Sequence, residues 1–385
     1  MSLRVVQSTP VWLPRTQTWM YEHLRRLPGG IESHVVCDRT QNLDQFEVPR
    51  LHRPSPLGRL ADGGLRFVGL RRSPGLLGSV ARRIGARVLH SHFGHVGWRD
   101  RDAARRARLR HVVTFYGQDL GYLPRLEPRW RPRYAEMFRG VDRVLCEGPH
   151  MAQGIAELGC PRDKVKVHHL GVDLDALAFR PRRWDGRPPL RVLLAGSFTE
   201  KKGFPDAVEA LAKLGAGVEA TLVGDADGKP RNQAEKRRIL EAIGRTGLRV
   251  RRLGYQSHRR LLEEAYAHHV FLSPSVTASD GDTEGGVPVT ILEMAATGMP
   301  VVITRHADIA HALPCALLGA ERDPEGLARH LRFLADHPDR WGPLAEEARC
   351  RLEAHYDVSR QAERLAAIYA EVAGVDPRRA VGAVA

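Results

Sequence analysis

The stretch that decides the fold, residues 280–302, reads DGDTEGGVPVTILEMAATGMPVV. Two glycines and a proline lead into an apolar helical pattern, so free backbone N–H groups and the positive end of a helix dipole are expected there. Such a helix start binds an anion, usually a phosphate. Glu284 and Glu293 are carboxylates and cannot bind phosphate, but they accept hydrogen bonds from hydroxyl groups. The stretch therefore predicts a ligand with both phosphate and sugar, such as a nucleotide sugar.

A second informative stretch lies upstream. The apolar run Leu190 to Ala195 is typical of a buried strand, and GSFTEKKG follows at 196–203 before an amphipathic helical pattern. A lysine pair alone is more often part of a solvated surface loop. Between a strand and a helix start, however, Lys201 and Lys202 are placed to contact a phosphate.

Length and composition indicate an ordinary globular protein. The 385 residues, 43% hydrophobic and 27% charged, predict about two domains. The chain enters a strand pattern at once, and no apolar stretch reaches the roughly 18 residues that span a bilayer. We therefore expect a cytoplasmic protein. Five scattered cysteines without a Cys-x-x-Cys pair predict reduced thiols and no structural zinc.

The net charge of +14 raises the question of nucleic acid or an anionic membrane. No helix-turn-helix, zinc-finger or RNA-binding signature is present, so no nucleic-acid partner is expected. Residues 66–87 mix arginines with apolar residues and could rest peripherally on anionic headgroups at the inner face of the membrane. Because Pro74, Gly75 and Gly78 interrupt its helical period, a solvated basic surface is the favoured interpretation.

Strand and helix patterns alternate along the chain, which predicts α/β architecture with parallel sheets covered by helices on both faces. In the first half we expect strands at Leu3 to Gln7, Ser33 to Cys37, Val88 to His92, His111 to Phe115, Val141 to Cys146 and Val165 to Leu170. In the second half we expect them at Leu190 to Ala195, Ala220 to Val223, Val250 to Leu253, Val270 to Leu272 and Pro300 to Ile303.

The proline-rich segment Arg180 to Pro189 is interpreted as a linker. It predicts two Rossmann-like, doubly wound domains, residues 1–182 and 183–355, followed by a last helix within 356–385. Ligands bind beyond the carboxyl ends of parallel strands, so two such domains facing each other would form a cleft. The phosphate and sugar signals assign the nucleotide sugar to the second domain and leave the acceptor to the first.

Together, the two glycine-rich stretches resemble the donor-binding signature of retaining glycosyltransferases of family four, the bacterial group 1 enzymes with the GT-B fold. The family pattern is Glu-Gly-x-x-Pro, a second Glu, and Gly-x-Pro-Val-Val, the last matching residues 298–302. Here eight residues separate Glu284 from Glu293, where the family usually has seven, and Ser197 replaces a family Arg. The resemblance implies that the last helix crosses back to the first domain.

The resemblance also implies roles in the donor site. Lys202 and Glu284 would be catalytic, with Lys202 holding the diphosphate and Glu284 the sugar hydroxyls, while Glu293 would bind the ribose. Lys201 or an arginine from elsewhere would replace the cation missing at Ser197. The other expected donor contacts are Tyr255 near the base and the turn Gly285, Gly286, Val287 and Pro288.

In the first domain, four residues are candidates for the acceptor side. His92 is the last residue of an expected strand, and a metal site there is disfavoured because no cysteine or paired carboxylate is near. Tyr116 occupies the place of a family His, and a phenol is a hydrogen-bond donor at neutral pH rather than a base. Asp119 either positions an acceptor hydroxyl or caps the following turn. Arg15 could reach the cleft.

The triplet Asp280-Gly-Asp282 matches the metal motif of a different glycosyltransferase architecture. Its place in a two-domain layout favours a simple loop feature, so we expect no obligatory metal cofactor. Lys202 and the helix starts near Gly203 and Gly286 would neutralise the leaving diphosphate instead.

The resulting hypothesis is a retaining transferase that moves a sugar from a nucleoside-diphosphate donor, UDP in preference to GDP, to an acceptor hydroxyl. Bacterial cell-surface polysaccharide biosynthesis is the expected setting, with a lipid-linked acceptor left open. Three alternatives stay open: a transferase acting on a small natural product, a sugar-nucleotide epimerase or phosphorylase on the same fold, and a non-enzymatic basic protein that binds nucleic acid or membrane.

Overall fold

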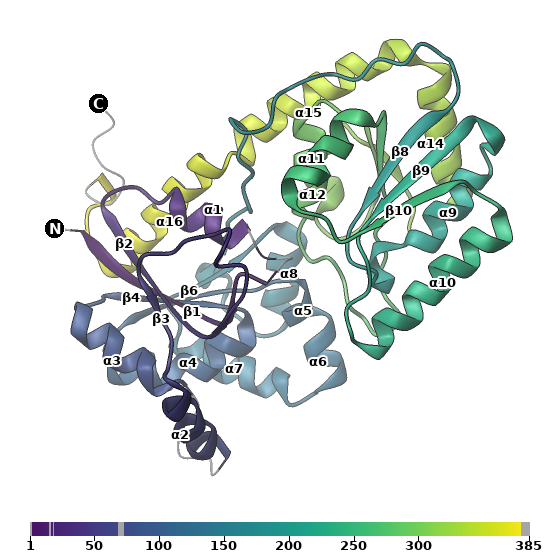
Figure 1. Ribbon diagram of the computed structural model, residues 1–385. Coiled ribbons are helices and arrows are strands. Elements are labelled where there is room, and N and C mark those ends of the chain that lie inside the picture. Colours follow the sequence, from purple (N-terminus) through teal and green to yellow (C-terminus); the bar gives the residue numbers. More distant parts are fainter. Residues whose placement is uncertain (1, 15–16, 18, 68–72, 379–385) are drawn as a thin grey trace. The chain divides into compact units, whose positions relative to one another are not determined.

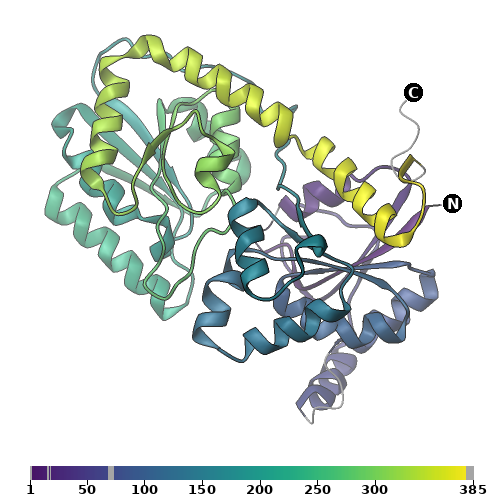
Figure 2. The same cartoon turned by 180° about the vertical axis from the view of Figure 1, so that it is seen from behind.

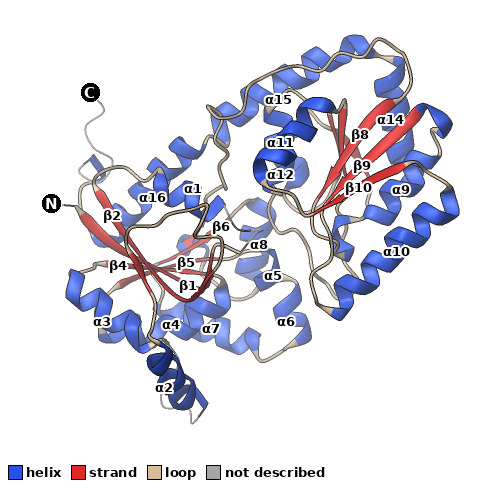
Figure 3. Cartoon of the chain, viewed as in Figure 1, coloured by secondary structure: helices blue, strands red, loops and turns tan. Residues whose placement is uncertain are grey.

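The computed structural model describes residues 2–14, 17, 19–67 and 73–378 (Figure 1). Contacts divide the chain into two units, one formed by Met1–Gly171 together with the chain from Asp357 onward, the other by Val172–Tyr356. Each unit is a parallel sheet with helices on both faces (Figure 3). Among the described residues, no helix combines the length and apolar character that crossing a membrane requires.

The first unit has a seven-stranded sheet in the order β3-β2-β1-β4-β5-β6-β7. Its strands are β1 (Leu3–Trp12), β2 (Ile31–Thr40), β3 (Leu51–His52), β4 (Val88–His92), β5 (Arg110–Thr114), β6 (Arg143–Cys146) and β7 (Val165–Val167). Its helices are α1 (Trp19–Arg25), α2 (Pro56–Phe67), α3 (Gly75–Ile84), α4 (Gly94–Arg106), α5 (Gly117–Leu120), α6 (Tyr122–Leu126), α7 (Trp130–Gly140), α8 (Pro149–Glu157) and α16 (Val358–Ala373). The short 3-10 helix η1 spans Arg162–Lys164.

The last helix, α16, packs on this first sheet. Leu365, Ala366 and Tyr369 of α16 form one apolar cluster with Val5 of β1 and Val88 of β4. The neighbouring residues of the same strands, such as Val6 and Leu89, point to the opposite face and pack against α3. Burial on both faces explains why consecutive residues of these strands are buried, rather than every second one.

The second unit has a six-stranded sheet in the order β10-β9-β8-β11-β12-β13. Its strands are β8 (Leu190–Ala195), β9 (Val218–Val223), β10 (Val250–Gly254), β11 (Val270–Ser273), β12 (Val301–Thr304) and β13 (Leu317–Gly319). Its helices are α9 (Phe204–Ala212), α10 (Pro230–Thr246), α11 (His258–Ala267), α12 (Val289–Ala296), α13 (Ile309–Ala312), α14 (Pro324–Asp336) and α15 (Trp341–His355). The 3-10 helices are η2 (Glu200–Lys202), η3 (Gly215–Gly217) and η4 (Pro338–Arg340).

Alternate residues of the central strands join different cores. Phe271 packs with Ile291 and Leu352, whereas its neighbours Val270 and Leu272 join the cluster on the other face. Helices α12 and α15 therefore cover one face of the sheet, and α9 and α14 cover the other (Figure 2).

Most predicted strands lie where the apolar runs place them. The sequence pattern predicts a helix over Asp100 to Arg108, but helix α4 begins earlier. It starts at Gly94, directly after β4. A Cβ on Gly94 would lie 2.6 Å from the ring of Phe115, and one on Gly97 would lie 2.7 Å from Val113. The two glycines therefore allow α4 to pack closely on β5, although the sequence pattern treats glycine as an interruption of a helix.

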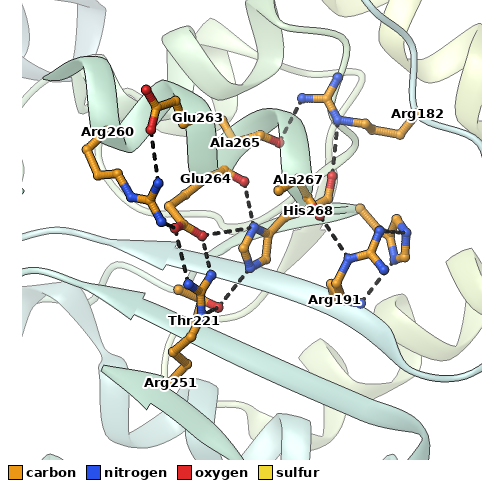
Figure 4. A network of polar contacts seen from close by, with 11 residues as sticks. Arg182, Arg191, Thr221, Arg251, Arg260, Glu263, Glu264, Ala265, Ala267 and His268 are labelled. Atoms are coloured by element: carbon orange, nitrogen blue, oxygen red, sulfur yellow. Dashed lines mark hydrogen bonds and ion pairs between the residues drawn. The ribbon is translucent and has the colours of Figure 1, made fainter. Parts of the chain in front are cut away.

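The segment interpreted as a linker, Arg180 to Pro189, belongs by its contacts to the second unit, which begins at Val172 rather than at residue 183. Arg182 is buried, and its guanidinium donates to the carbonyl oxygens of Ala265 at 2.9 Å and His268 at 3.1 Å (Figure 4). These bonds attach the segment to α11. A sequence pattern does not reveal them, because prolines and charges look like solvated loop.

Candidate active site

Lys202 and Glu284 lie at the carboxyl ends of neighbouring strands. Lys202 ends η2, which follows β8, and Glu284 lies in the long loop after β11. The strand order reverses between β8 and β11, because β9 and β10 lie on one side of this pair and β12 and β13 on the other. Open parallel sheets bind their ligands at such a switch point.

The loop after β8 packs directly on the loop after β11. Gly203 has a φ of +61°, and a Cβ there would lie 1.9 Å from the backbone oxygen of Pro274. The Val276 N–H donates to the carbonyl of Lys201 at 2.9 Å. Only glycine permits this approach, so the last glycine of the GSFTEKKG stretch fixes Lys202 against the second loop.

Lys202 and Glu284 form a largely buried ion pair. Lys202 Nζ lies 2.8 Å from Glu284 Oε1, and Ser275 Oγ donates to the same oxygen at 3.1 Å. Burial alone would raise the pKa of Glu284, but the charges of Lys202 and Lys201 outweigh it, and the pKa is lowered. Glu284 is therefore ionised at neutral pH. No side chain in the described part of the chain bonds to its Oε2, which is left to accept from a ligand hydroxyl.

The Asp280-Gly-Asp282 turn is held by cations of the chain itself. Lys201 Nζ lies 3.2 Å from Asp282 Oδ1 and donates to the Thr283 carbonyl at 3.0 Å. Arg231, in the first turn of α10, lies 2.9 Å from Asp280 Oδ2. The triplet thus lies in a loop, and its two carboxylates are paired with Lys201 and Arg231.

Within the described ranges, no group of three or more His, Cys, Asp or Glu side chains is arranged to hold a metal ion. Independence from a divalent ion stays a prediction.

His306 is a site residue that sequence reasoning missed. Its Nε2 accepts the backbone N–H of Glu284 at 3.1 Å, and its Nδ1 lies 2.7 Å from Glu321 Oε1. Because Nε2 accepts, Nδ1 carries the proton and donates to Glu321, which fixes the ring. His306 thus positions the Glu284 segment. His306 could have been predicted as a site residue from its position just after β12, at the same edge of the sheet as Lys202.

The turn before α12 presents backbone donors. Gly285 has a φ of +76°, and Pro288 is the N-cap residue of the eight-residue helix. Among the described residues, no internal hydrogen bond takes up the N–H groups of Gly285, Gly286 or Val287. The Val287 side chain belongs to the core, so this residue can offer only its backbone. The turn therefore has the free donors expected of an anion site.

Glu293 of α12 contacts the start of α11, which follows the loop after β10. Its Oε1 is 2.8 Å from His258 Nε2, at the first residue of α11, and half-exposed Tyr255 lies three residues earlier. No contact among the described residues joins Glu293 to Lys202 or Glu284. The convergence of all three around one ligand stays a prediction.

Helix α11, which carries His258, is anchored by a charged network (Figure 4). The buried carboxylate of Glu264 pairs with Arg251 of β10 and with Arg260 of its own helix. His268 Nε2 bonds to Thr221 Oγ1 of β9 at 2.8 Å. These contacts fix the start of α11 next to Glu293.

Ser197, the residue in place of the family arginine, follows β8 and is partly exposed. Its carbonyl accepts the Thr199 N–H at 2.8 Å. Lys201, one of the two replacements expected for the family arginine, pairs with Asp282, and its contact with a phosphate stays a prediction.

In the first unit, His92 and Tyr116 meet at the ends of β4 and β5. Tyr116 Oη lies 2.9 Å from His92 Nδ1, and Gln7 Oε1 lies 3.0 Å from His92 Nε2. With the Gln7 amide oxygen on this side, His92 Nε2 carries the proton and Tyr116 donates to Nδ1. Tyr116 is therefore a hydrogen-bond donor, and its oxygen can still accept a bond from a ligand hydroxyl.

The network continues to the last helix. Gln7 Nε2 donates to Tyr369 Oη of α16 at 3.0 Å, and Tyr369 Oη lies 2.7 Å from His90 Nδ1. His90 Nε2 lies 2.6 Å from Thr114 Oγ1. Hydrogen bonds therefore connect α16 with the ends of β4 and β5, and each side chain in this series positions the next.

The first-unit network is uncharged at neutral pH. Burial lowers the pKa of His92 to about 3, and burial together with His92 lowers that of His90 well below its usual value. Burial, with Glu147 and Asp119 adding to it, raises the pKa of Tyr116 well above its usual value. None of these groups is a base near neutral pH, which agrees with the inference drawn from Tyr116 in the sequence.

Of the two interpretations of Asp119, the structure shows the cap. Asp119 is fully buried, and its Oδ2 accepts the Tyr116 N–H at 3.1 Å. Its Oδ1 lies 3.2 Å from His95 Nδ1. Asp119 thus holds Tyr116 in place, and its contact with an acceptor hydroxyl stays a prediction. Arg15, the remaining acceptor-side candidate, lies outside the described residues.

Two family models match the chain. The model for Glycosyltransferase Family 4 covers residues 16–176, and the model for Glycosyl transferases group 1 covers residues 189–337.

Among curated relatives, the putative colanic acid biosynthesis glycosyltransferase WcaL of Escherichia coli (strain K12) is 29% identical over 73% of this chain and 70% of that protein. The amylovoran biosynthesis glycosyltransferase AmsK of Erwinia amylovora is 28% identical over 74% of this chain and 70% of its own length.

Solved structures of other proteins resemble this structure over nearly the whole chain. Anabaena HepE, in complex with UDP, has a TM-score of 0.77 at 16% identity and covers 96% of this chain and 100% of that chain. Sucrose-phosphate synthase from Thermosynechococcus elongatus has a TM-score of 0.77 at 17% identity, with 96% and 99% covered. At such identities the likeness shows the fold alone. The family models show that the chain belongs to glycosyltransferase family 4, and the solved structures show that it has the GT-B fold.

Proposed function

We propose that the protein is a retaining glycosyltransferase that moves a sugar from a UDP-sugar to an acceptor hydroxyl in bacterial cell-surface polysaccharide biosynthesis. The observation that carries the proposal is the buried Lys202–Glu284 pair at the switch point of the second sheet. The names of WcaL and AmsK support the polysaccharide setting, and the UDP complex of HepE supports the nucleotide.

The donor diphosphate binds where positive charge and free donors meet. Lys202 supplies a cation, and the N–H groups of Gly285, Gly286 and Val287 supply hydrogen bonds at the start of α12. These groups stabilise the negative charge that develops on the departing diphosphate. Glu284 accepts hydrogen bonds from the sugar hydroxyls through its open oxygen.

The nucleoside end of the donor lies toward the loop after β10. Glu293, oriented by His258, accepts from the ribose hydroxyls, and Tyr255 lies near the base. This assignment places the ribose contact on α12, the helix whose N-terminal turn binds the diphosphate.

The transfer step uses no enzymatic base. The bond between the anomeric carbon and the phosphate oxygen breaks, and the acceptor oxygen bonds to the same face of that carbon through an oxocarbenium-like transition state. The acceptor proton passes to the leaving phosphate oxygen. Support comes from the first-unit candidates: the pKa of His92 is too low and that of Tyr116 too high for a base at neutral pH.

The test combines binding with stereochemistry. Calorimetry with UDP-, GDP- and ADP-sugars should give saturable binding that is tightest for a UDP-sugar. During slow donor hydrolysis, NMR should first detect the free sugar with the anomeric configuration of the donor, and chelation by EDTA should leave the rate unchanged. Release of the opposite anomer would contradict retention. Conversion of the donor alone into an epimerised nucleotide sugar would favour an epimerase.

A further inference from the structure

Phe93 forms the whole turn between β4 and α4. The strand ends at His92 and the helix begins at Gly94, so a single residue connects them. Its φ is +78° and its ψ is +140°, close to a backbone region that is essentially restricted to glycine. Among the six non-glycine residues of the described chain with positive φ, Phe93 has the largest value. The turn therefore holds backbone strain that a glycine would relieve.

The shape of the turn follows from the close packing of α4. Gly94 and Gly97 let this helix lie directly against β5, so its first turn begins at the strand end. The Phe93 N–H donates to the carbonyl of Thr114 at 2.9 Å, and the Phe93 carbonyl accepts the Gly97 N–H at 3.0 Å. Both are backbone bonds that a glycine at this position would also make. The packing thus accounts for the positive φ but not for the choice of phenylalanine.

The ring of Phe93 lies outside the hydrophobic core. None of the apolar clusters in the described part of the chain includes it, and the side chain is partly exposed. Leu13 also has a positive φ, but its side chain is fully buried in such a cluster. Because a strained position persists only where the surrounding structure or the function needs it, the exposed ring of Phe93 indicates a function.

That ring lies beside the hydroxyl expected to meet the acceptor. The ring centroids of Phe93 and Tyr116 are 4.7 Å apart, and partly exposed Trp19 of α1 is 5.1 Å from the same tyrosine ring. The Tyr116 hydroxyl donates to His92 and can accept a bond from a ligand hydroxyl. A sugar ring has both features that this surface fits, because its C–H face packs on an aromatic ring and its hydroxyls form hydrogen bonds.

We propose that Phe93 is a specificity-determining residue of the acceptor site. The strained turn presents its ring to the C–H face of an acceptor sugar, one hydroxyl of which bonds to Tyr116. The acceptor is therefore a glycoside, and neither a simple aliphatic alcohol nor a phenol. This inference rests on the proposed transferase function and gives its acceptor a chemical class.

Saturation-transfer NMR with the methyl glycosides of glucose, galactose, mannose and fucose tests the proposal. At least one of them should bind the unchanged protein, and glycerol and phenol should not. Phe93→Leu keeps an apolar side chain without an aromatic face and should bind that glycoside about threefold more weakly. Phe93→Gly should bind it at least about fivefold more weakly, because the whole side chain is lost.

Thermal unfolding measures the strain separately. Phe93→Ala and Phe93→Gly both remove the ring, but only glycine relieves the positive φ. Phe93→Gly should therefore unfold roughly 2 °C or more above Phe93→Ala. The matched control is Arg108→Gly, because Arg108 is exposed, has a φ of +52° and follows the other end of α4. This control should bind the glycoside as tightly as the unchanged protein and unfold at no lower temperature.

Four results would overturn the proposal: no glycoside bound by the unchanged protein, phenol bound in place of the glycosides, undiminished binding by Phe93→Gly, or equal unfolding temperatures of the alanine and glycine variants. Failure of both Phe93→Gly and Phe93→Leu to fold would show that the ring has a structural role instead. Calorimetric affinity for UDP should be the same in all variants. Absence of UDP binding by the unchanged protein would count against the transferase proposal, whatever the result with glycosides.

Discussion

The carboxyl edges of the two sheets carry opposite kinds of polar chemistry. In the second unit, Lys202 and Glu284 form an ion pair beside free backbone donors. In the first unit, His92 and Tyr116 belong to a closed network of neutral groups. The same parallel α/β architecture therefore presents one edge suited to a diphosphate and another suited to a neutral hydroxyl.

The difference has a structural origin. The charged pair lies on glycine-rich loops that meet beyond the strands, where Gly203 touches Pro274. The neutral network lies within the strands themselves and under α16, where burial makes charge costly. Acid and single substitutions at either edge should affect the charged edge and the neutral edge differently.

The largest expected effect is a selective loss of stability of the first unit in acid. Burial lowers the pKa of His23 and His92 to about 3 and of His111 and His168 to about 4, from 6.5. Below pH 6.5 the unfolded chain therefore binds protons that the native unit does not. The contribution of these histidines to the free energy of unfolding is fully present above pH 6.5. It is lost as the pH falls toward 4, by about 2 kcal/mol per histidine at pH 5.

Hydrogen exchange resolved by peptide, at pH 7 and pH 5 and corrected for intrinsic rates, measures this effect. The second unit has fewer such groups, His268, His269 and His330. Protection should therefore fall more in the first unit. An equal or larger loss in the second unit would contradict the neutral network.

The second prediction concerns the charged edge. Lys202→Met should lower kcat/KM for the donor by about 100- to 1000-fold, because the diphosphate loses its cation and Glu284 is left as a buried, unpaired carboxylate. Lys201→Met is the matched control, since Lys201 pairs with Asp282 and holds a loop. Its loss should be clearly smaller, and equal losses would show that neither lysine has a specific role.

The third prediction concerns the neutral edge. Tyr116→Phe removes the hydroxyl that donates to His92 and should lower kcat for transfer by about tenfold, the loss of one or two hydrogen bonds. Donor affinity should not change. Steady-state kinetics with varied acceptor, together with UDP titration, checks both statements, and a parallel fall in UDP affinity would place Tyr116 in the donor site.

The smallest effect is expected from Tyr369→Phe on α16. It removes the bonds to Gln7 and His90 and should lower stability by about 1 kcal/mol and transfer by a few-fold. Nitrogen NMR of the imidazoles should show the tautomer of His90 or His92 becoming mixed. An unchanged tautomer with reduced transfer would mean that α16 acts in another way.

Local sequence patterns were sufficient to predict much of the fold. β4 and β8 have the predicted bounds, because each is a short strand whose residues are almost all buried. β3 and β13, with two and three residues at the sheet edges, are too short to produce a pattern. The start of α4 was missed because Gly94 and Gly97 serve close packing.

The site was predictable where a loop follows a strand and not where distant segments meet. Glycines next to Lys202 and Glu284 marked the charged edge. The bond from Gln7 to Tyr369 joins residues 362 positions apart, and His306 reaches Glu284 only after both loops have folded. Asp119 had two physically reasonable roles, and its capping bond to Tyr116 is seen only in the structure.

Calorimetric titration of UDP into three proteins tests the central claim most directly. The unchanged protein and Tyr116→Phe should bind UDP with the same affinity, and Lys202→Met should bind at least about tenfold more weakly, since it lacks one charge-assisted contact. Equal affinity in Lys202→Met, or no saturable binding by the unchanged protein, would contradict the assignment of the diphosphate to the charged edge of the second unit.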